Sequence, residues 1–126
     1  MNILISNTGG SPIYEQIAEQ IKAMIISGQL AADAPLPSMR LLAKELRVSL
    51  ITTKRAYEEL EREGYIRTVT GKGSFVAGLS SEHIREEQLR QIEESLRAAV
   101  QRAKLSGISL QELQELLSLL FEEDSQ

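Results

Sequence analysis

Residues 36–77 read LPSMRLLAKELRVSLITTKRAYEELEREGYIRTVTGKGSFVA, and the spacing of their apolar residues decides the fold. Ser38 is expected to cap a short helix over roughly 38–46, and Ser49 a longer helix that runs to about Glu63. Only Arg47 and Val48 separate the two, so these helices should cross steeply, as in a helix-turn-helix. Leu41, Leu42 and Leu46 are expected on the apolar side of the first helix; Thr53, Ala56, Tyr57 and Leu60 are expected on that of the second.

After Gly64 the pattern changes from helical to extended. Residues 65–69 alternate and are rich in β-branched and aromatic types, the stretch TGKG at 70–73 is a turn, and 74–76 resume as a strand. This predicts a β-hairpin with a cationic, glycine-rich tip.

A further helix is expected upstream, with Ser11 as its N-cap and Pro12 at its first position. It should end at Gly28, and residues 31–37 should form a loop, because Pro35 and Pro37 exclude a helix there. Its apolar residues recur at the spacing of one buried face: Ile13, Ile17, Ile21, Met24 and Ile25. Three helices followed by a hairpin make a winged helix-turn-helix, expected as a domain over 1–79.

Residues 80–126 are expected to form two helices. The first spans roughly 81–106, and the second starts at a capping box formed by Ser109 and Glu112. Apolar residues at spacings of three and four form a short heptad stripe on the first: Leu89, Ile92, Leu96, Ala99 and Ala103. Two such helices bury too little alone, so we expect residues 81–126 to pair two copies of the chain. The fold class is therefore mainly α with a small β-hairpin: a winged helix-turn-helix followed by a two-helix dimerisation region.

The composition excludes several function classes. The 126 residues include no Cys and one His, His83, which excludes disulfide scaffolds, thiolate zinc sites and mechanisms that need two imidazoles. We find no nucleophile–base pair, metal cluster or phosphate-binding loop, so we predict no enzyme and no cofactor. No apolar run is long enough for a membrane span and no signal peptide is recognised, so we expect a cytoplasmic protein without a membrane partner.

The net charge of −4 is unevenly distributed. Residues 1–80 carry nine basic and eight acidic side chains, whereas residues 81–126 carry five basic and ten acidic ones. This asymmetry suits a module that touches a polyanion at one end, and an ordinary solvated surface is the alternative. Because the third helix has the width of the major groove of B-DNA, duplex DNA is the expected partner.

The stretch at 36–77 resembles the GntR family of bacterial transcription factors, whose pattern is close to L-P-S-x-R-x-L-A-x-x-L-x-V-S-x-x-T-V-x-R-A-Y-x-x-L-E-x-E-G-x-I followed by G-x-G-x-F-V. The preceding P-I-Y-x-Q-I at 12–17 also fits. The short tail is similar to that of the YtrA-like branch, in which two helices mainly mediate dimerisation. The resemblance implies a homodimeric repressor that binds an inverted repeat, often at an ABC-transporter operon and at its own gene.

The resemblance also implies roles for individual residues. Arg40 occupies the family's DNA-contacting arginine, and Lys54 a common basic contact; Arg55 could instead pair with Glu58 or Glu59. Ser49 and Thr52 match hydroxyl positions that bond phosphates or bases. The wing tip, which reaches the minor groove or its phosphates in relatives, is formed here by Thr70, Gly71 and Lys72.

Leu50 and Ile51 depart from the family pattern, which places Arg, Pro or Asn there. Apolar side chains cannot hydrogen-bond bases, but they can contact thymine methyl groups, so we expect half-sites that contain thymine.

Two other functions remain open at this point: a winged-helix module that binds protein instead of DNA, and a sensor with an unknown small-molecule effector at the dimer interface.

Overall fold

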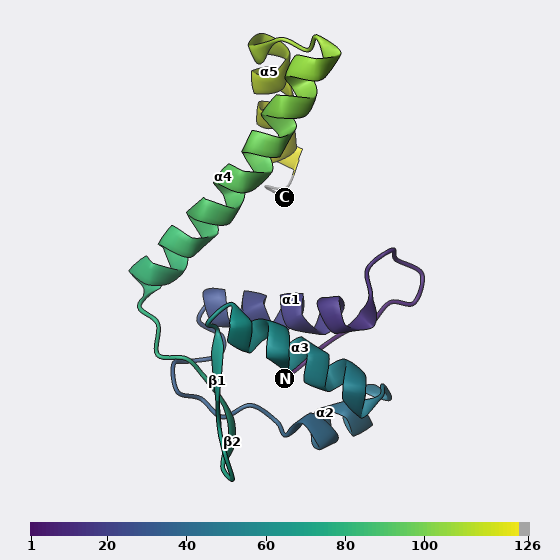
Figure 1. Cartoon of the computed structure of the whole chain (residues 1–126), viewed down its shortest axis with the longest axis vertical. Coiled ribbons are helices and arrows are strands. Elements are labelled where there is room, and N and C mark those ends of the chain that lie inside the picture. Colours follow the sequence, from purple (N-terminus) through teal and green to yellow (C-terminus); the bar gives the residue numbers. More distant parts are fainter. Residues whose placement is uncertain (124–126) are drawn as a thin grey trace. The chain divides into compact units, whose positions relative to one another are not determined.

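The computed structural model describes residues 1–123, the side chain of Ser81 excepted (Figure 1). The chain forms two compact units, Met1–Ser81 and Glu82–Gln126. The elements follow in the order α1 (Ile13–Ile26), α2 (Met39–Leu46), α3 (Leu50–Arg62), β1 (Ile66–Val69), β2 (Gly73–Val76), α4 (Ser81–Ser106) and α5 (Leu110–Glu123). The predicted fold class, three helices and a hairpin followed by two helices, is confirmed.

The core of the first unit lies where α1 and α2 both pack on α3. Ile17 and Ile21 of α1, Leu42 of α2 and Leu60 of α3 are almost completely buried. Tyr57 is buried as well, and its hydroxyl donates a hydrogen bond of 2.7 Å to the carbonyl oxygen of Pro37. Burial raises the pKa of the Tyr57 phenol above its ordinary value, so it stays a neutral donor. Through this bond α3 fixes the chain that leads into α2.

In the first unit, two of the predicted N-caps are confirmed and one is wrong. The hydroxyl oxygens of Ser38 and Ser49 accept hydrogen bonds from the amides of Leu41 and Thr52, as expected of N-cap residues. The prediction for Ser11 is wrong: Pro12 is the N-cap residue of α1, and no side chain caps that helix. Pro12 takes an extended ψ of 152°, so its carbonyl already accepts the first helical bonds from outside the helix.

Leu41 does not join the core and is 47% exposed. It lies only one position from Leu42, and adjacent helical residues point about 100° apart. The buried face of α2 is centred between Leu42 and Ala43, so Leu41 points about 150° away from its centre, toward solvent. The expectation that Leu41 belongs to the apolar face of α2 is therefore wrong.

The turn between α2 and α3 closes with Arg47 in the left-handed conformation, at φ 57°. The amide of Val48 bonds the carbonyl of Ala43 across this turn, at 3.0 Å. A residue with a Cβ carries a conformational cost there that glycine avoids, about 1 kcal/mol. The connection is nevertheless as short as the sequence indicates, and α2 packs against α3 across it.

The hairpin has a third backbone neighbour that the sequence did not reveal. β1 and β2 pair antiparallel, with Ile66 opposite Val76 and Val69 opposite Gly73. The loop before α2 then adds to the free edge of β2: the amide of Leu36 bonds the carbonyl of Ser74, and the amide of Val76 bonds the carbonyl of Ala34, both at 2.9 Å. The wing is therefore held on both sides of β2.

The segment before α1 is fastened to that helix by two glutamine side chains. Gln20 accepts a hydrogen bond from the amide of Leu4 and donates one to its carbonyl, and Gln16 does the same with Ser6. Ile3 is buried. The side-chain amides thus satisfy backbone groups of an extended segment, as a neighbouring strand would.

Lys22 of α1 is buried and forms an ion pair with Glu63 just after α3, with 2.7 Å between Nζ and the carboxylate oxygen. A second carboxylate, that of Glu19, lies 3.3 Å away. Burial alone would lower the pKa of Lys22, but the hydrogen bond from Lys22 to Glu63 and the charges of both carboxylates raise it above the ordinary value of 10.5.

Replacing Lys22 with methionine should make the unfolding free energy less sensitive to high pH. Because the folded-state pKa of Lys22 is raised, its stabilising contribution is fully present below the unfolded-state pKa and is lost as the pH rises through the folded-state pKa. Urea unfolding of both proteins at pH 8 and at about pH 11 would measure this difference in the pH dependence of the unfolding free energy. An unchanged gap between wild type and Lys22→Met across that range would contradict the assignment.

In the second unit, α4 and α5 form a helical hairpin. Gly107 turns the chain at φ 72°, and Ser109 and Glu112 form the predicted capping box. Ala103 is the buried apolar residue of the described part of this unit, whereas most of its leucines are exposed. Of the helices in residues 1–123, none is long and apolar enough to cross a membrane.

Candidate nucleic-acid interface

The outward face of α3 carries a stripe of charged and apolar side chains. Thr53, Ala56, Tyr57 and Leu60 are the buried residues of this helix. Side chains at about 100° per residue place Ile51 opposite the centre of that buried side, and Lys54 and Arg55 follow one turn later on the same face. Ile51, Lys54 and Arg55 are all exposed, and their predicted contact with DNA stays a prediction.

The hydroxyl groups at the start of α3 are largely engaged with each other. Ser49 Oγ accepts from the amide of Thr52 at 3.1 Å, and the two hydroxyl oxygens lie 2.7 Å apart in a further hydrogen bond. One hydroxyl proton of the pair satisfies that bond, which leaves the other to reach a phosphate or base. Ser49 and Thr52 are therefore first a helix cap, and their predicted contact with DNA depends on the remaining proton.

Arg40 is the second residue of α2, and its side chain is exposed. Because α2 packs on α3 and a short turn joins them, Arg40 belongs to the same compact unit as the α3 stripe, Met1–Ser81, called the head below. Leu41, the exposed neighbour of Arg40, adds an apolar side chain to that region of α2. The contact of Arg40 with DNA stays a prediction.

Arg55 stacks on an aromatic ring, whereas the sequence left open an ion pair with Glu58 or Glu59. Its guanidinium lies over the ring of Tyr14, 3.8 Å from the ring centroid, whereas Glu59 pairs with Arg62. The stack links α1 to α3, whereas an ion pair with Glu58 or Glu59 would stay within one helix. A stacked guanidinium keeps its in-plane N–H groups available, so Arg55 retains donors for a phosphate.

The three wing-tip residues lie together in the turn between β1 and β2. Thr70, Gly71 and Lys72 are exposed, and the amide of Lys72 closes the turn on the carbonyl of Val69 at 2.9 Å. Gly71 takes φ 79°, a conformation that favours glycine, and open space surrounds the position of a Cβ there. The tip is thus free to approach another molecule.

At the base of the wing, Arg67 is engaged within the head. Its guanidinium pairs with Asp33 at 3.1 Å and lies over the ring of Phe75. Lys72 at the tip, in contrast, extends from the turn itself. Of these two cations, Lys72 is the one that lies at the exposed tip.

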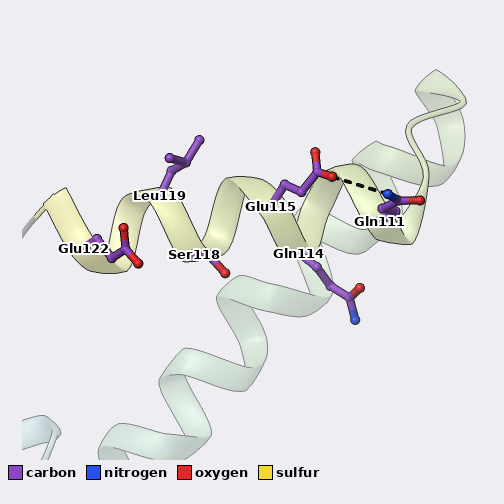
Figure 2. Close-up of a pocket in the computed structure, with 6 residues that line it drawn as sticks. All are labelled: Gln111, Gln114, Glu115, Ser118, Leu119 and Glu122. Carbon is purple, nitrogen blue, oxygen red and sulfur yellow. Dashed lines mark hydrogen bonds between the residues drawn. The ribbon is translucent and has the colours of Figure 1, made fainter.

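A second candidate surface is the apolar face of the α4–α5 hairpin. Aliphatic side chains line a hollow of about 270 Å³ on it, among them Leu96, Ala99 and Val100 from α4 and Leu113, Leu117 and Leu120 from α5. On α4, ion pairs at helical spacing satisfy the charged face, for example Arg97 with Glu93 at 2.8 Å. The polar side of α5, with Gln111 bonded to Glu115 and Leu119 beside them, is drawn in Figure 2.

The chain matches known proteins along most of its length. The profile of the bacterial regulatory proteins of the gntR family matches residues 13–76. The HTH-type transcriptional repressor YtrA of Bacillus subtilis is 34% identical over 113 residues, which cover 90% of this chain and 87% of that protein.

Solved structures agree with these sequence matches. A transcriptional antiterminator from Listeria monocytogenes superimposes with a TM-score of 0.73 and 29% identity, covering 95% of this chain and 90% of that one. The DNA-binding domain of AraR in complex with operator ORE1 has a TM-score of 0.54 and 31% identity, covering 61% of this chain and 99% of that one. The relatives are transcriptional regulators and not enzymes. The chain thus belongs to the gntR family of bacterial regulatory proteins and is a DNA-binding transcriptional regulator with a winged helix-turn-helix head.

Proposed function

We propose that the chain is a homodimeric repressor that binds an inverted-repeat operator through residues 1–79 and pairs through residues 80–126. The observation that carries this proposal is the outward stripe of α3, where exposed Lys54 and Arg55 follow Ile51 on the side opposite the core. A helix with such a face fits the major groove, and its first turn meets the base edges.

The roles within the head divide by chemistry. Arg40, Lys54 and Lys72 bind phosphates, because each is an exposed cation without an ordering function in the core. Thr70 and Gly71 bring the wing tip close to the minor groove or its phosphates. Among residues 49–54, the side chains other than Lys54 and the buried Thr53 read bases, and Arg55, held against Tyr14, lies beside them on the same face. Phosphate contacts fix the position of the head on the duplex, and base contacts determine which DNA sequence it prefers.

Dimerisation follows from the apolar face of α4 and α5. Leu96, Leu117 and Leu120 remain about half exposed in a single copy, and the hollow between them has aliphatic walls. A second copy supplies matching leucines, and a two-fold axis makes the same patch serve both chains. The almost entirely aliphatic lining of the hollow offers few polar groups to orient a small molecule, which favours a partner's leucines over an effector as its occupant.

We extend the proposal to the target: the gene of the protein itself, together with an operon encoding a membrane ABC transporter. These are the targets that the short-tailed branch implies. Repression results from occupation of promoter DNA, and the protein acts in the cytoplasm.

A footprint on the DNA upstream of its own gene tests the function. We expect protection of two half-sites related by two-fold symmetry, in the presence of excess random competitor duplex. Two half-sites spaced by about one helical turn or a multiple of it would match a two-fold dimer. Failure to retain any duplex above the competitor would instead favour a winged-helix module that binds protein.

A further inference from the structure

Ile51 is a large apolar side chain that contributes little to the core of the head. It is 80% exposed, at the second residue of α3. The buried side of the helix is already filled by Thr53, Ala56, Tyr57 and Leu60, and Ile51 points away from it. Leu50, the preceding residue, is 39% exposed and lies nearer the edge of the buried side.

Most of the polar side chains near Ile51 are already engaged in contacts within the chain. Ser49 and Thr52 are hydrogen-bonded to each other, and the Ser49 hydroxyl also caps the helix. Lys54 and Arg55 lie one turn further along, and Arg55 is held over Tyr14. In the first turn of α3, the more exposed of the two large side chains is therefore aliphatic, and it has no hydrogen-bonding group.

Among the base edges in the major groove, the C5-methyl group of thymine is the one apolar feature. An isoleucine there gains contact with a methyl group but leaves the donors and acceptors of other bases desolvated and unpaired. We propose that Ile51 determines sequence specificity by packing on a thymine methyl in each half-site. This inference rests on the proposed function, in which the first turn of α3 enters the major groove.

The test begins with the full-length protein and a selection of bound duplexes from a random pool. In the selected operator, each recurrent thymine is replaced by uracil in both half-sites, which removes the methyl group and keeps the base pair. At the thymine that Ile51 contacts, the replacement removes one buried methyl group. This loss should weaken binding of the wild-type protein roughly fourfold for each half-site. Ile51→Ala should bind the thymine and uracil operators equally well.

Two further variants keep the result specific to Ile51. Lys54→Ala, on the same face, should weaken binding to both operators by the same factor and so preserve the preference for thymine. Ile51→Val, which removes one methylene, should retain part of the preference. Because Ile51 is exposed, both substitutions at this position should leave the melting temperature unchanged, which circular dichroism would verify.

Three outcomes would overturn the inference. Selected half-sites made of G and C alone, or a thymine preference that survives intact in Ile51→Ala, would show that Ile51 does not read the methyl group while leaving the DNA-binding function in place. A wild-type protein that prefers no duplex over random competitor would overturn the proposed function as well, so the two failures are distinguishable.

Discussion

Leu117→Asp is expected to convert the dimer into a monomer and to weaken operator binding by about 100-fold or more. Leu117 is 52% exposed in one copy and lines the apolar hollow with Leu96 and Leu120. In the proposed dimer this face is covered, so an aspartate there would be buried without a partner, at a cost of several kcal/mol. Light scattering would give the mass, and a mobility shift on the selected operator would give the affinity.

Leu119→Asp provides a matched control for that substitution. Leu119 is 65% exposed, is also in α5, and lies on the polar side of that helix with Gln111 and Glu115 (Figure 2). The same change of side chain there should leave the protein dimeric and its affinity unchanged. If Leu119→Asp also produced monomers, or Leu117→Asp remained dimeric, the two copies would not pair through the face that we assign.

Raising the salt concentration from 50 to 200 mM should weaken operator binding by roughly a thousandfold. Arg40, Lys54 and Lys72 provide three phosphate contacts in each head, and a dimer doubles them. Each contact releases counterions and contributes about −0.9 to the slope of log affinity against log salt, so the slope should be near −5. Fluorescence anisotropy with a labelled operator would measure it, and an affinity that stayed constant with salt would contradict phosphate binding.

Lys72→Ala tests the wing within the same experiment. Since the substitution removes one contact from each head, the salt slope should become about two units shallower. Binding to operator and to random duplex should weaken by the same factor, because a phosphate contact carries no sequence information. A loss confined to a single base position would mean that Lys72 reads a base instead.

The helices could be predicted because their signals are local. Ser38, Ser49 and the capping box at Ser109 need only their own amides within the next turn, and Gly64 and Gly107 end helices through their own φ angles. The positions of Thr53 and Leu60 on one buried face follow from periodicity alone. Such features depend on a few neighbouring residues and can therefore be predicted from the sequence.

What the sequence did not reveal depends on contacts between distant segments. The stack of Arg55 on Tyr14 joins residues of α3 and α1, and the glutamine contacts of α1 fasten a segment that carries no helix or strand signal. The error at Leu41 has a related cause, because the number of leucines in a short helix does not say which of them meet a neighbour. For the candidate site, the sequence supplied the residue types, and the structure added which of their hydrogen-bonding groups are already engaged.

The loop before α2 has a mechanical consequence. It adds backbone hydrogen bonds to β2 on one side, and its Pro37 carbonyl is held by Tyr57 of α3 on the other. A force applied at the hairpin tip is therefore transmitted through this loop to the middle of α3, at Tyr57. We expect the head to engage neighbouring grooves in concert, so that a duplex whose groove spacing does not suit the tip would also displace the helix.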